Sequence, residues 1–240
     1  DLYMGSDATG IQPRYFGTRE QYGDLYDFVH AHRDLLNDSV PIAEIGLLVN
    51  GDKPGACSDA CLKLAARQFP FRIVFGASRY ARVPVAAESL RGLRLLVEFS
   101  PADSFCADDR AVLDAARAAG LVRFVSASAD LAAIGRSMGL DLLRVEGPDN
   151  VYAFVRATPA SGACFIHLVN WNLGDDAERA ETYRHMTLAL LHPERWGAVA
   201  KAVWHAPGKA SVTLVPERHT DCVRLTLPRL DTWGIVETAR

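Results

Sequence analysis

The sequence lacks the long apolar runs and the excess of basic residues that mark membrane proteins and nucleic-acid-binding proteins. No apolar run approaches the roughly 18–20 residues that a membrane-spanning helix requires. Lys and Arg number 26 against 29 Asp and Glu, and the resulting net charge of -3 provides no surplus of positive charge to attract phosphate groups. We therefore expect neither a membrane nor a nucleic acid as a partner.

Cysteine is scarce as well. Five cysteines, an odd number scattered over 240 residues, do not make a disulfide framework. The first residues also lack the basic segment and the apolar segment of a signal peptide. Both absences favour reduced thiols and a cytoplasmic location.

Two of the cysteines stand at a spacing that metal and redox sites use. Cys57 and Cys61, in CSDAC, lie four positions apart and share one face of a helix. No second Cys or His pair at ligand spacing lies near them, and cysteine is often a small buried apolar residue. We expect a structural role for the pair and no metal site.

Phosphate-binding signatures are also missing. The first apolar strand, IAEIGLLVN, continues into NGDKPGACSD, which fits neither G-x-G-x-x-G nor G-x-x-x-x-G-K-[ST]. Those glycines are needed where backbone amides and a helix N-terminus hold a phosphate group. We expect no nucleotide and no other cofactor.

Residues 41–145 alternate between short apolar runs and helical stretches. IAEIGLLVN, FRIVFGA, LRLLVEFS and LVRFVSA are predicted strands, and CSDACLKLAARQ, ADDRAVLDAARAAG and DLAAIGRSMG are predicted helices. Nearly continuous apolar strands separated by helices are typical of a mainly parallel sheet covered on both faces. This segment is predicted to be an α/β domain of Rossmann-like arrangement.

Residues 146–240 have a different period. DNVYAFVRAT, ACFIHLVNW, KAVWHA, KASVTLVPE, DCVRLTLP and TWGIVETA are short, rich in β-branched and aromatic residues, and separated by turn residues. Six or seven such strands predict a β-sandwich. ERAETYRHMTLALLHPERW fits the helix period and the strand period in different parts.

The N-terminal 40 residues comprise a glycine-rich opening and a helix. In DLYMGSDATGIQPRYFG, three glycines and Pro13 predict a loop without regular strand or helix. Residues 18–38 predict an amphipathic helix. Its expected buried stripe consists of Tyr22, Leu25, Tyr26, Val29, Leu35 and Leu36. His30 and His32 are expected at the surface, because residues two apart on a helix point to different faces.

In a parallel sheet, catalytic side chains are expected at the carboxyl ends of the strands. Cys106 follows LRLLVEFS near a helix N-terminus, and Ser126 and Ser128 follow LVRFVSA. The serines lack the G-x-S-x-G turn that an exposed nucleophile needs, and the nearest downstream histidine is His167 in the other domain. In IHLVNWN, strand alternation places His167 and Trp171 on one face, where they either bind a sugar or fill a core.

The order of these parts resembles the C-terminal half of a glycoside hydrolase. A loop containing PRYFG, an amphipathic helix, a Rossmann-like domain and a β-sandwich ending in LPRLDTWGIVET follow one another. The layout is similar to that of β-galactosidases in which a catalytic barrel precedes a trimerisation domain of class I glutamine-amidotransferase-like fold and a small β domain. The resemblance covers nearly all of the chain, and it rests on this order.

The resemblance implies that residues 1–40 correspond to the end of a (β/α)8 barrel. Active sites of such barrels are built from loops at the C-terminal face. Tyr3, Arg14 and Tyr15 are therefore candidates for a sugar subsite, with packing of the loop as the alternative, and Trp171 is a further candidate. Retaining glycosidases need two carboxylates about 5 Å apart, which the resemblance places in earlier barrel strands. The resemblance thus implies no catalytic residue within this chain.

Three functions remain as hypotheses. The first is a non-catalytic region of a carbohydrate-active hydrolase that docks an upstream barrel, assembles subunits and lines the sugar cleft. The second is a self-contained carbohydrate-binding module that uses Trp171, Trp204 or Trp233. The third is an amidotransferase-like hydrolase that uses Cys106.

Overall fold

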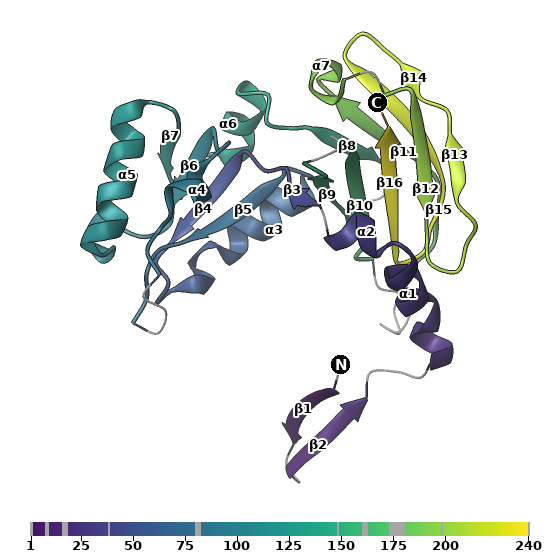
Figure 1. Cartoon of the computed structure of the whole chain (residues 1–240), viewed down its shortest axis with the longest axis horizontal. Helices are drawn as coiled ribbons and strands as arrows, with labels where there is room; N and C mark the ends of the chain where they lie inside the picture. Colours follow the sequence, from purple (N-terminus) through teal and green to yellow (C-terminus); the bar gives the residue numbers. More distant parts are fainter. Residues whose placement is uncertain are drawn as a thin grey trace.

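The computed structural model describes residues 2–7, 10–15, 19–37, 39–79, 83–147, 149–159, 163–172, 181–197 and 199–239. An α/β half and a β-sandwich half lie next to each other, and a two-stranded hairpin stands at the N terminus (Figure 1). The predicted combination of an α/β fold with an all-β fold is confirmed. None of the helices in the described residues is long and apolar enough to cross a bilayer.

The N-terminal hairpin corrects the predicted loop. Strands β1 (Leu2–Asp7) and β2 (Gly10–Tyr15) pair antiparallel and form a sheet of their own. The prediction that glycine and proline exclude a strand here was wrong. Each strand of a two-stranded sheet is an edge, and an edge tolerates proline because half of its amides have no partner strand to bind.

Helices α1 (Arg19–Ala31) and α2 (Arg33–Asn37) follow the hairpin. Phe28 of α1 is buried and packs against Phe165 and Ile235 of the sandwich. Tyr26 and Val29 are 65% and 42% exposed, so the predicted buried stripe was wrong for these two positions. The helical period also fits a neighbouring apolar stripe that runs through Phe28. Which of the two stripes is buried depends on the surface that the helix packs against, here the sandwich.

The surface position expected for His32 was also wrong. Its ring lies between those of Phe28, 4.4 Å away, and His205, 4.8 Å away between ring centroids. His32 Nδ1 is 2.9 Å from the carbonyl oxygen of Phe28. This side chain therefore belongs to the contact between α1 and the sandwich, whereas His30 is exposed as expected.

The α/β half contains a parallel sheet of four strands in the order β5-β4-β6-β7. These are β4 (Ile45–Val49), β5 (Phe71–Phe75), β6 (Leu95–Glu98) and β7 (Arg123–Ser126), the four strands predicted from the apolar runs. Helices α3 (Ser58–Ala66) and α6 (Leu131–Ser137) share one apolar core with the sheet. Helices α4 (Ala87–Leu90) and α5 (Ala107–Ala119) share a second core on the other face.

Capping residues set the ends of these helices. Gly120 ends α5 in the left-handed conformation at φ 64°, which glycine adopts without steric cost. Asp130 begins α6 by accepting a hydrogen bond from the amide of Ala133. Short 3-10 helices, Pro54–Cys57 and Ala102–Ser104, precede α3 and α5.

The sandwich half packs two antiparallel sheets on one core. The first has the order β13-β12-β16-β10-β9-β3, formed by β13 (Val212–Leu214), β12 (Lys201–His205), β16 (Trp233–Ala239), β10 (Cys164–Asn170), β9 (Val151–Ala157) and β3 (Val40–Pro41). The second has the order β14-β15-β11-β8, formed by β14 (Glu217–Arg218), β15 (Cys222–Leu230), β11 (Tyr183–Leu191) and β8 (Leu143–Glu146). The ambiguous stretch before residue 197 forms β11 and helix α7 (Pro193–Trp196).

The first strand of the sandwich, β3, precedes the α/β half in the sequence. Strand β3 pairs with β9, although nearly 100 residues of α/β fold lie between them in the sequence. Side-chain contacts also join the halves. Among them, Gln68 donates to the carbonyl of Val151 at 3.4 Å, and Arg195 of α7 donates to Glu44 at 2.6 Å and to the carbonyl of Gly139 at 2.9 Å. The junction between the halves is thus held by strand pairing and by side-chain hydrogen bonds and ion pairs.

Candidate functional site

The outer face of the six-stranded sheet carries aromatic and basic side chains. Along β10, Ile166 and Leu168 are fully buried in the sandwich core, so His167 and Val169 point to the opposite face. Phe154 of β9 lies directly beside His167. Trp233 of β16 lies directly beside Val169. Three adjacent strands therefore build one aromatic surface that faces away from the core.

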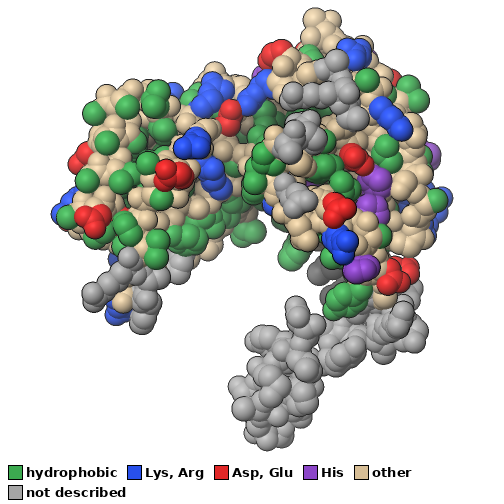
Figure 2. Space-filling view, in the orientation of Figure 1, with side chains coloured by type: hydrophobic (Ala, Val, Ile, Leu, Met, Phe, Trp, Pro, Cys, Tyr) green, Lys and Arg blue, Asp and Glu red, His purple; other side chains and the backbone are tan. Residues whose placement is uncertain are grey.

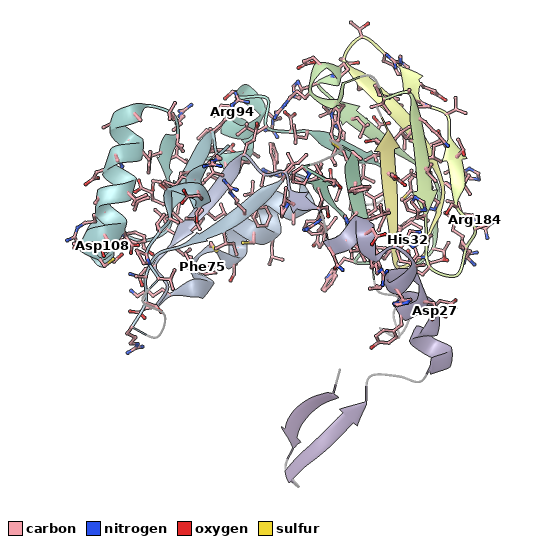
Figure 3. The ribbon with its side chains drawn as sticks, in the orientation of Figure 1. Asp27, His32, Phe75, Arg94, Asp108 and Arg184 are labelled. Atoms are coloured by element: carbon pink, nitrogen blue, oxygen red, sulfur yellow. The ribbon has the colours of Figure 1, made fainter. Side chains whose placement is uncertain are left out.

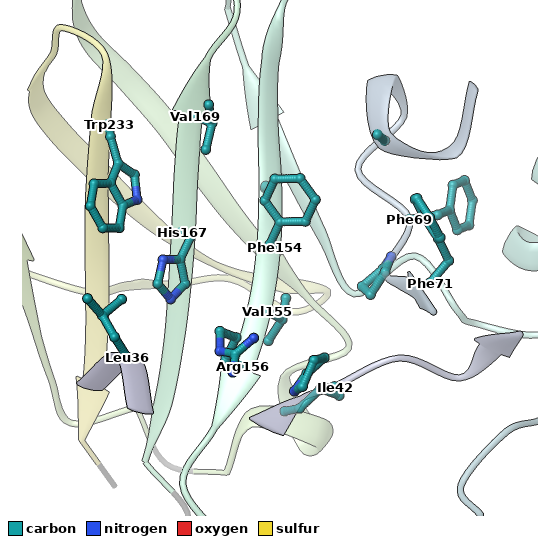
Figure 4. A pocket seen from close by; sticks show the side chains of 14 residues that line it. Leu36, Ile42, Phe69, Phe71, Phe154, Val155, Arg156, His167, Val169 and Trp233 are labelled. Atoms are coloured by element: carbon teal, nitrogen blue, oxygen red, sulfur yellow. The ribbon is translucent and has the colours of Figure 1, made fainter. Parts of the chain in front are cut away.

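A pocket of about 500 Å³ lies between this surface and the α/β half. Phe69 and Pro70, between α3 and β5, and Phe71, the first residue of β5, form the opposite wall (Figure 4). We call it the junction pocket; its lining residues are Leu36, Pro41, Ile42, Ala65, Phe69, Pro70, Phe71, Ala153, Phe154, Val155, Arg156, His167, Val169 and Trp233. A concave, mostly apolar cavity of this size between domains is the usual form of a small-ligand site.

His167 is one of the two basic side chains that line the junction pocket. It is 8% exposed, and its ring stacks on Trp233 with centroids 5.9 Å apart. Its Nε2 atom is buried and has no hydrogen-bond partner among the described residues. Burial, followed by the positive charge of Arg156, lowers the pKa of His167 from 6.5 to about 4. The imidazole is therefore neutral near pH 7.

Arg156 supplies the other basic group. Its Nε atom donates to the hydroxyl of Ser39 at 2.8 Å, and Nη2 donates to the carbonyl of the same residue. Within the described residues, no Asp or Glu forms an ion pair with Arg156, and none lines the pocket. The pocket is consequently apolar with a positive charge at its wall.

Three of the predicted sugar-subsite residues, Tyr3, Arg14 and Tyr15, belong to the N-terminal hairpin. Tyr3 and Arg14 face each other as register partners in the hairpin, and Tyr15 pairs with Leu2. Their side chains lie outside the residues whose side chains the structure describes. Their role as subsite residues stays a prediction.

Trp171 lies beyond the end of β10 and does not line the junction pocket. It is 61% exposed, and its ring stacks on that of Tyr152 at a centroid distance of 6.3 Å. Trp204, by contrast, is 2% exposed and belongs to the sandwich core. Of the three tryptophans considered for sugar binding, Trp171 is exposed, Trp233 lines the pocket, and Trp204 is structural.

Sequence reasoning did not single out Arg156 or Phe154. A usable signal was present in DNVYAFVRAT, where alternation places Tyr152, Phe154 and Arg156 on one face. That pattern does not reveal that this face meets a turn located 80 residues earlier in the sequence. The pocket depends on contacts between the two halves.

Cys106 lies as expected at the N-cap of α5, at the carboxyl ends of the parallel strands. It is exposed beside a second cavity of about 460 Å³, and its Sγ accepts a hydrogen bond from the amide of Asp109 at 3.4 Å. No histidine is among the residues described as lining this cavity. A cysteine nucleophile without a neighbouring base lacks the group that activates it.

Cys57 and Cys61 lie together, with 3.8 Å between their Sγ atoms. Burial, with the neighbouring Cys57 thiol, raises the pKa of Cys61 to about 12. Metal binding and thiol exchange require the thiolate, which this environment disfavours. Within the described part of the chain, no group of three or more His, Cys, Asp or Glu side chains is placed to hold a metal ion.

Comparison with solved structures relates the fold to that of a known enzyme. No protein-family model and no curated protein sequence matches the chain. Among solved structures, the chain is similar to α-L-fucosidase isoenzyme 2 from Paenibacillus thiaminolyticus, with a TM-score of 0.60 and 12% sequence identity. The match covers 89% of this chain and 51% of that chain, so the chain spans about half the length of the fucosidase structure. At this identity the similarity shows a shared fold.

Proposed function

We propose that the chain is the non-catalytic C-terminal region of a carbohydrate-active glycoside hydrolase and that it docks a catalytic domain. Its fold is shared with about half of a fucosidase chain, and this supports a role beside a separate catalytic domain. The strand order of the α/β half is second-first-third-fourth along the chain. This order supports the amidotransferase-like, doubly wound assignment of that half.

An exposed apolar face carries this proposal. Strand β5 is an edge of the parallel sheet, and its Ile73 and Phe75 are 39% and 51% exposed. Leu62 of α3 is 60% exposed. Figure 3 labels Phe75 on the lower side of the α/β half, and Figure 2 shows hydrophobic side chains along this side.

Such a face favours a covered position in the whole protein. Edge strands of soluble domains usually carry charges or proline, and large apolar patches mark interaction surfaces. Tyr26 and Val29 of α1 are further exposed apolar residues. The proposed occupant is an upstream (β/α)8 barrel of the same polypeptide, with a second subunit as the alternative occupant.

The test begins with the intact mass of the natural gene product. A mass well above 26.2 kDa is expected, because the proposal requires a catalytic domain outside this chain. In that product, the double variant Ile73→Lys, Phe75→Lys is expected to reduce hydrolysis of 4-nitrophenyl α-L-fucoside or β-D-galactoside at least about tenfold, because burying two charges weakens docking. It should also expose the interdomain segment to protease.

The matched control is Val215→Lys, since Val215 is an exposed apolar residue of the sandwich half. This variant should leave activity and proteolysis unchanged. A natural mass equal to 26.2 kDa would remove the proposal. Equal behaviour of the control and the double variant would show that the β5 face is not the docking surface.

The exposed ring of Trp171, stacked on the half-buried ring of Tyr152, favours a second candidate function, binding of carbohydrate by the chain itself. Flat apolar sugar faces stack on exposed aromatic rings. Titration of galacto-, fuco- and gluco-oligosaccharides should then change tryptophan fluorescence, and Trp171→Ala should remove the change. Trp233→Ala is the control, because Trp233 lies in the junction pocket. An absence of any response in the unaltered chain would exclude this function.

A further inference from the structure

We infer that the junction pocket binds a small ligand with a fused-ring or similarly flat apolar body and a single carboxylate. The carboxylate would lie between Arg156 and His167, and the apolar body between Phe71, Phe154 and Trp233. This site is distinct from the docking face and from Trp171, so it does not depend on the proposed function.

The charge of the pocket selects an anion. Arg156 is bonded only to Ser39 among the described residues and has no carboxylate partner there. A guanidinium that no described carboxylate compensates, placed beside apolar walls, attracts negative charge more strongly than it would in water. Arg also presents paired N–H donors that match the geometry of a carboxylate.

His167 provides the second polar contact. Phe154 is the register partner of His167, and Arg156 follows two positions along β9, so the two basic residues are diagonal neighbours on one face. Figure 4 shows both side chains between Trp233 and Ile42. The buried Nε2 atom of His167 has no partner in the described residues. A neutral imidazole protonated at Nε2 donates to a carboxylate oxygen, and this hydrogen bond would satisfy the buried Nε2–H group.

The walls select an apolar body over a sugar. Apart from Arg156 and His167, all the side chains that line the pocket are hydrocarbon or aromatic. A monosaccharide would bury several hydroxyl groups without partners, and each buried unpaired group is costly. A volume of about 500 Å³ accommodates a bicyclic ring system with room to spare.

Calorimetric titration of the full chain with three probes tests the site. The probes are 2-naphthoate, 2-naphthylmethanol, which lacks the charge, and glucuronate, which lacks the apolar body. We expect 2-naphthoate to bind at least tenfold more tightly than either of the others. Equal binding of the alcohol would overturn the carboxylate assignment, and preferential binding of glucuronate would overturn the apolar one. Absence of binding by all three would overturn the site.

Variants locate the binding. Arg156→Met should weaken 2-naphthoate binding about ten- to hundredfold, the range expected for a lost charged hydrogen bond. It should leave binding of the alcohol unchanged. The control is Arg184→Met, because Arg184 is an exposed residue of β11 in the other sheet (Figure 3). Circular dichroism checks folding of both variants. The three-probe comparison uses the unaltered chain, so it decides the proposal even if Arg156→Met does not fold.

Discussion

Replacement of Asp109 by alanine should lower the free energy of unfolding by about 4 kcal/mol, from the loss of two buried hydrogen bonds to a charged acceptor. Asp109 is fully buried in the first turn of α5. Its carboxylate accepts hydrogen bonds from the amide of Val85 at 2.7 Å and from the amide of Ala77 at 3.0 Å. The carboxylate thus holds both ends of the segment between β5 and α4.

The size of the effect follows from what alanine leaves behind. The hydrogen bond that the amide of Val85 donates is buried, so this amide has no ready access to solvent after the substitution. Each unsatisfied buried donor costs about 1–3 kcal/mol, and donors that faced a charge cost more. Urea denaturation followed by far-UV circular dichroism measures the difference.

Asp108 is the matched control for this experiment. It is the preceding residue of the same helix turn, but its side chain is exposed (Figure 3). Asp108→Ala removes only a favourable interaction with the helix dipole, worth about 0.3–1 kcal/mol. If Asp109→Ala costs no more than Asp108→Ala, the carboxylate does not organise the segment.

Acidification should destabilise the fold through His167. Folding lowers the pKa of this side chain from 6.5 to about 4 because burial disfavours the imidazolium. Between these two values the unfolded chain binds a proton that the folded chain does not bind, so stability falls as the pH falls. The contribution of neutral His167 to the free energy of unfolding is complete above pH 6.5 and is lost by about pH 4.

The expected loss is up to about 1.4 kcal/mol per pH unit within this range, or about 3 kcal/mol in total. The unfolding free energies of the unaltered chain and of His167→Asn, measured from pH 7 to pH 4, should converge as the pH falls, since the variant has no proton to bind at this position. His219→Asn is the control, because His219 is exposed. Parallel profiles for the unaltered chain and His167→Asn would contradict the assignment.

Local sequence signals were sufficient for most elements of the α/β half. The run IGLLV is apolar at every position, and its strand β4 is buried at every position, because both sheet faces are covered. Gly120 marks the end of α5 because a left-handed residue is required there. The strand is buried on both faces, and the end of the helix depends on the conformation of one residue. Both properties are visible in a short stretch of sequence, so the sequence predicts these elements well.

The errors occurred where two packing choices satisfied one pattern. The helical period of residues 18–38 allows stripes through Tyr26 or through Phe28, and contact with Phe165 and Ile235 selects Phe28. The glycines of the N-terminal stretch allow either a loop or an edge pair, and the observed register pairs Leu2 with Tyr15. Neither choice can be predicted without knowledge of the surface or strand that each segment packs against.

The sequence by itself determined an α/β segment followed by a sandwich, and it determined that His167 shares a strand face with Val169. The tertiary structure alone decided what each face meets. The second sheet covers the face of Ile166 and Leu168, and the turn at Phe69 closes the face of His167 into a pocket. Alternation along a strand depends on backbone geometry, which is local, whereas the surface that covers each face comes from distant segments through packing.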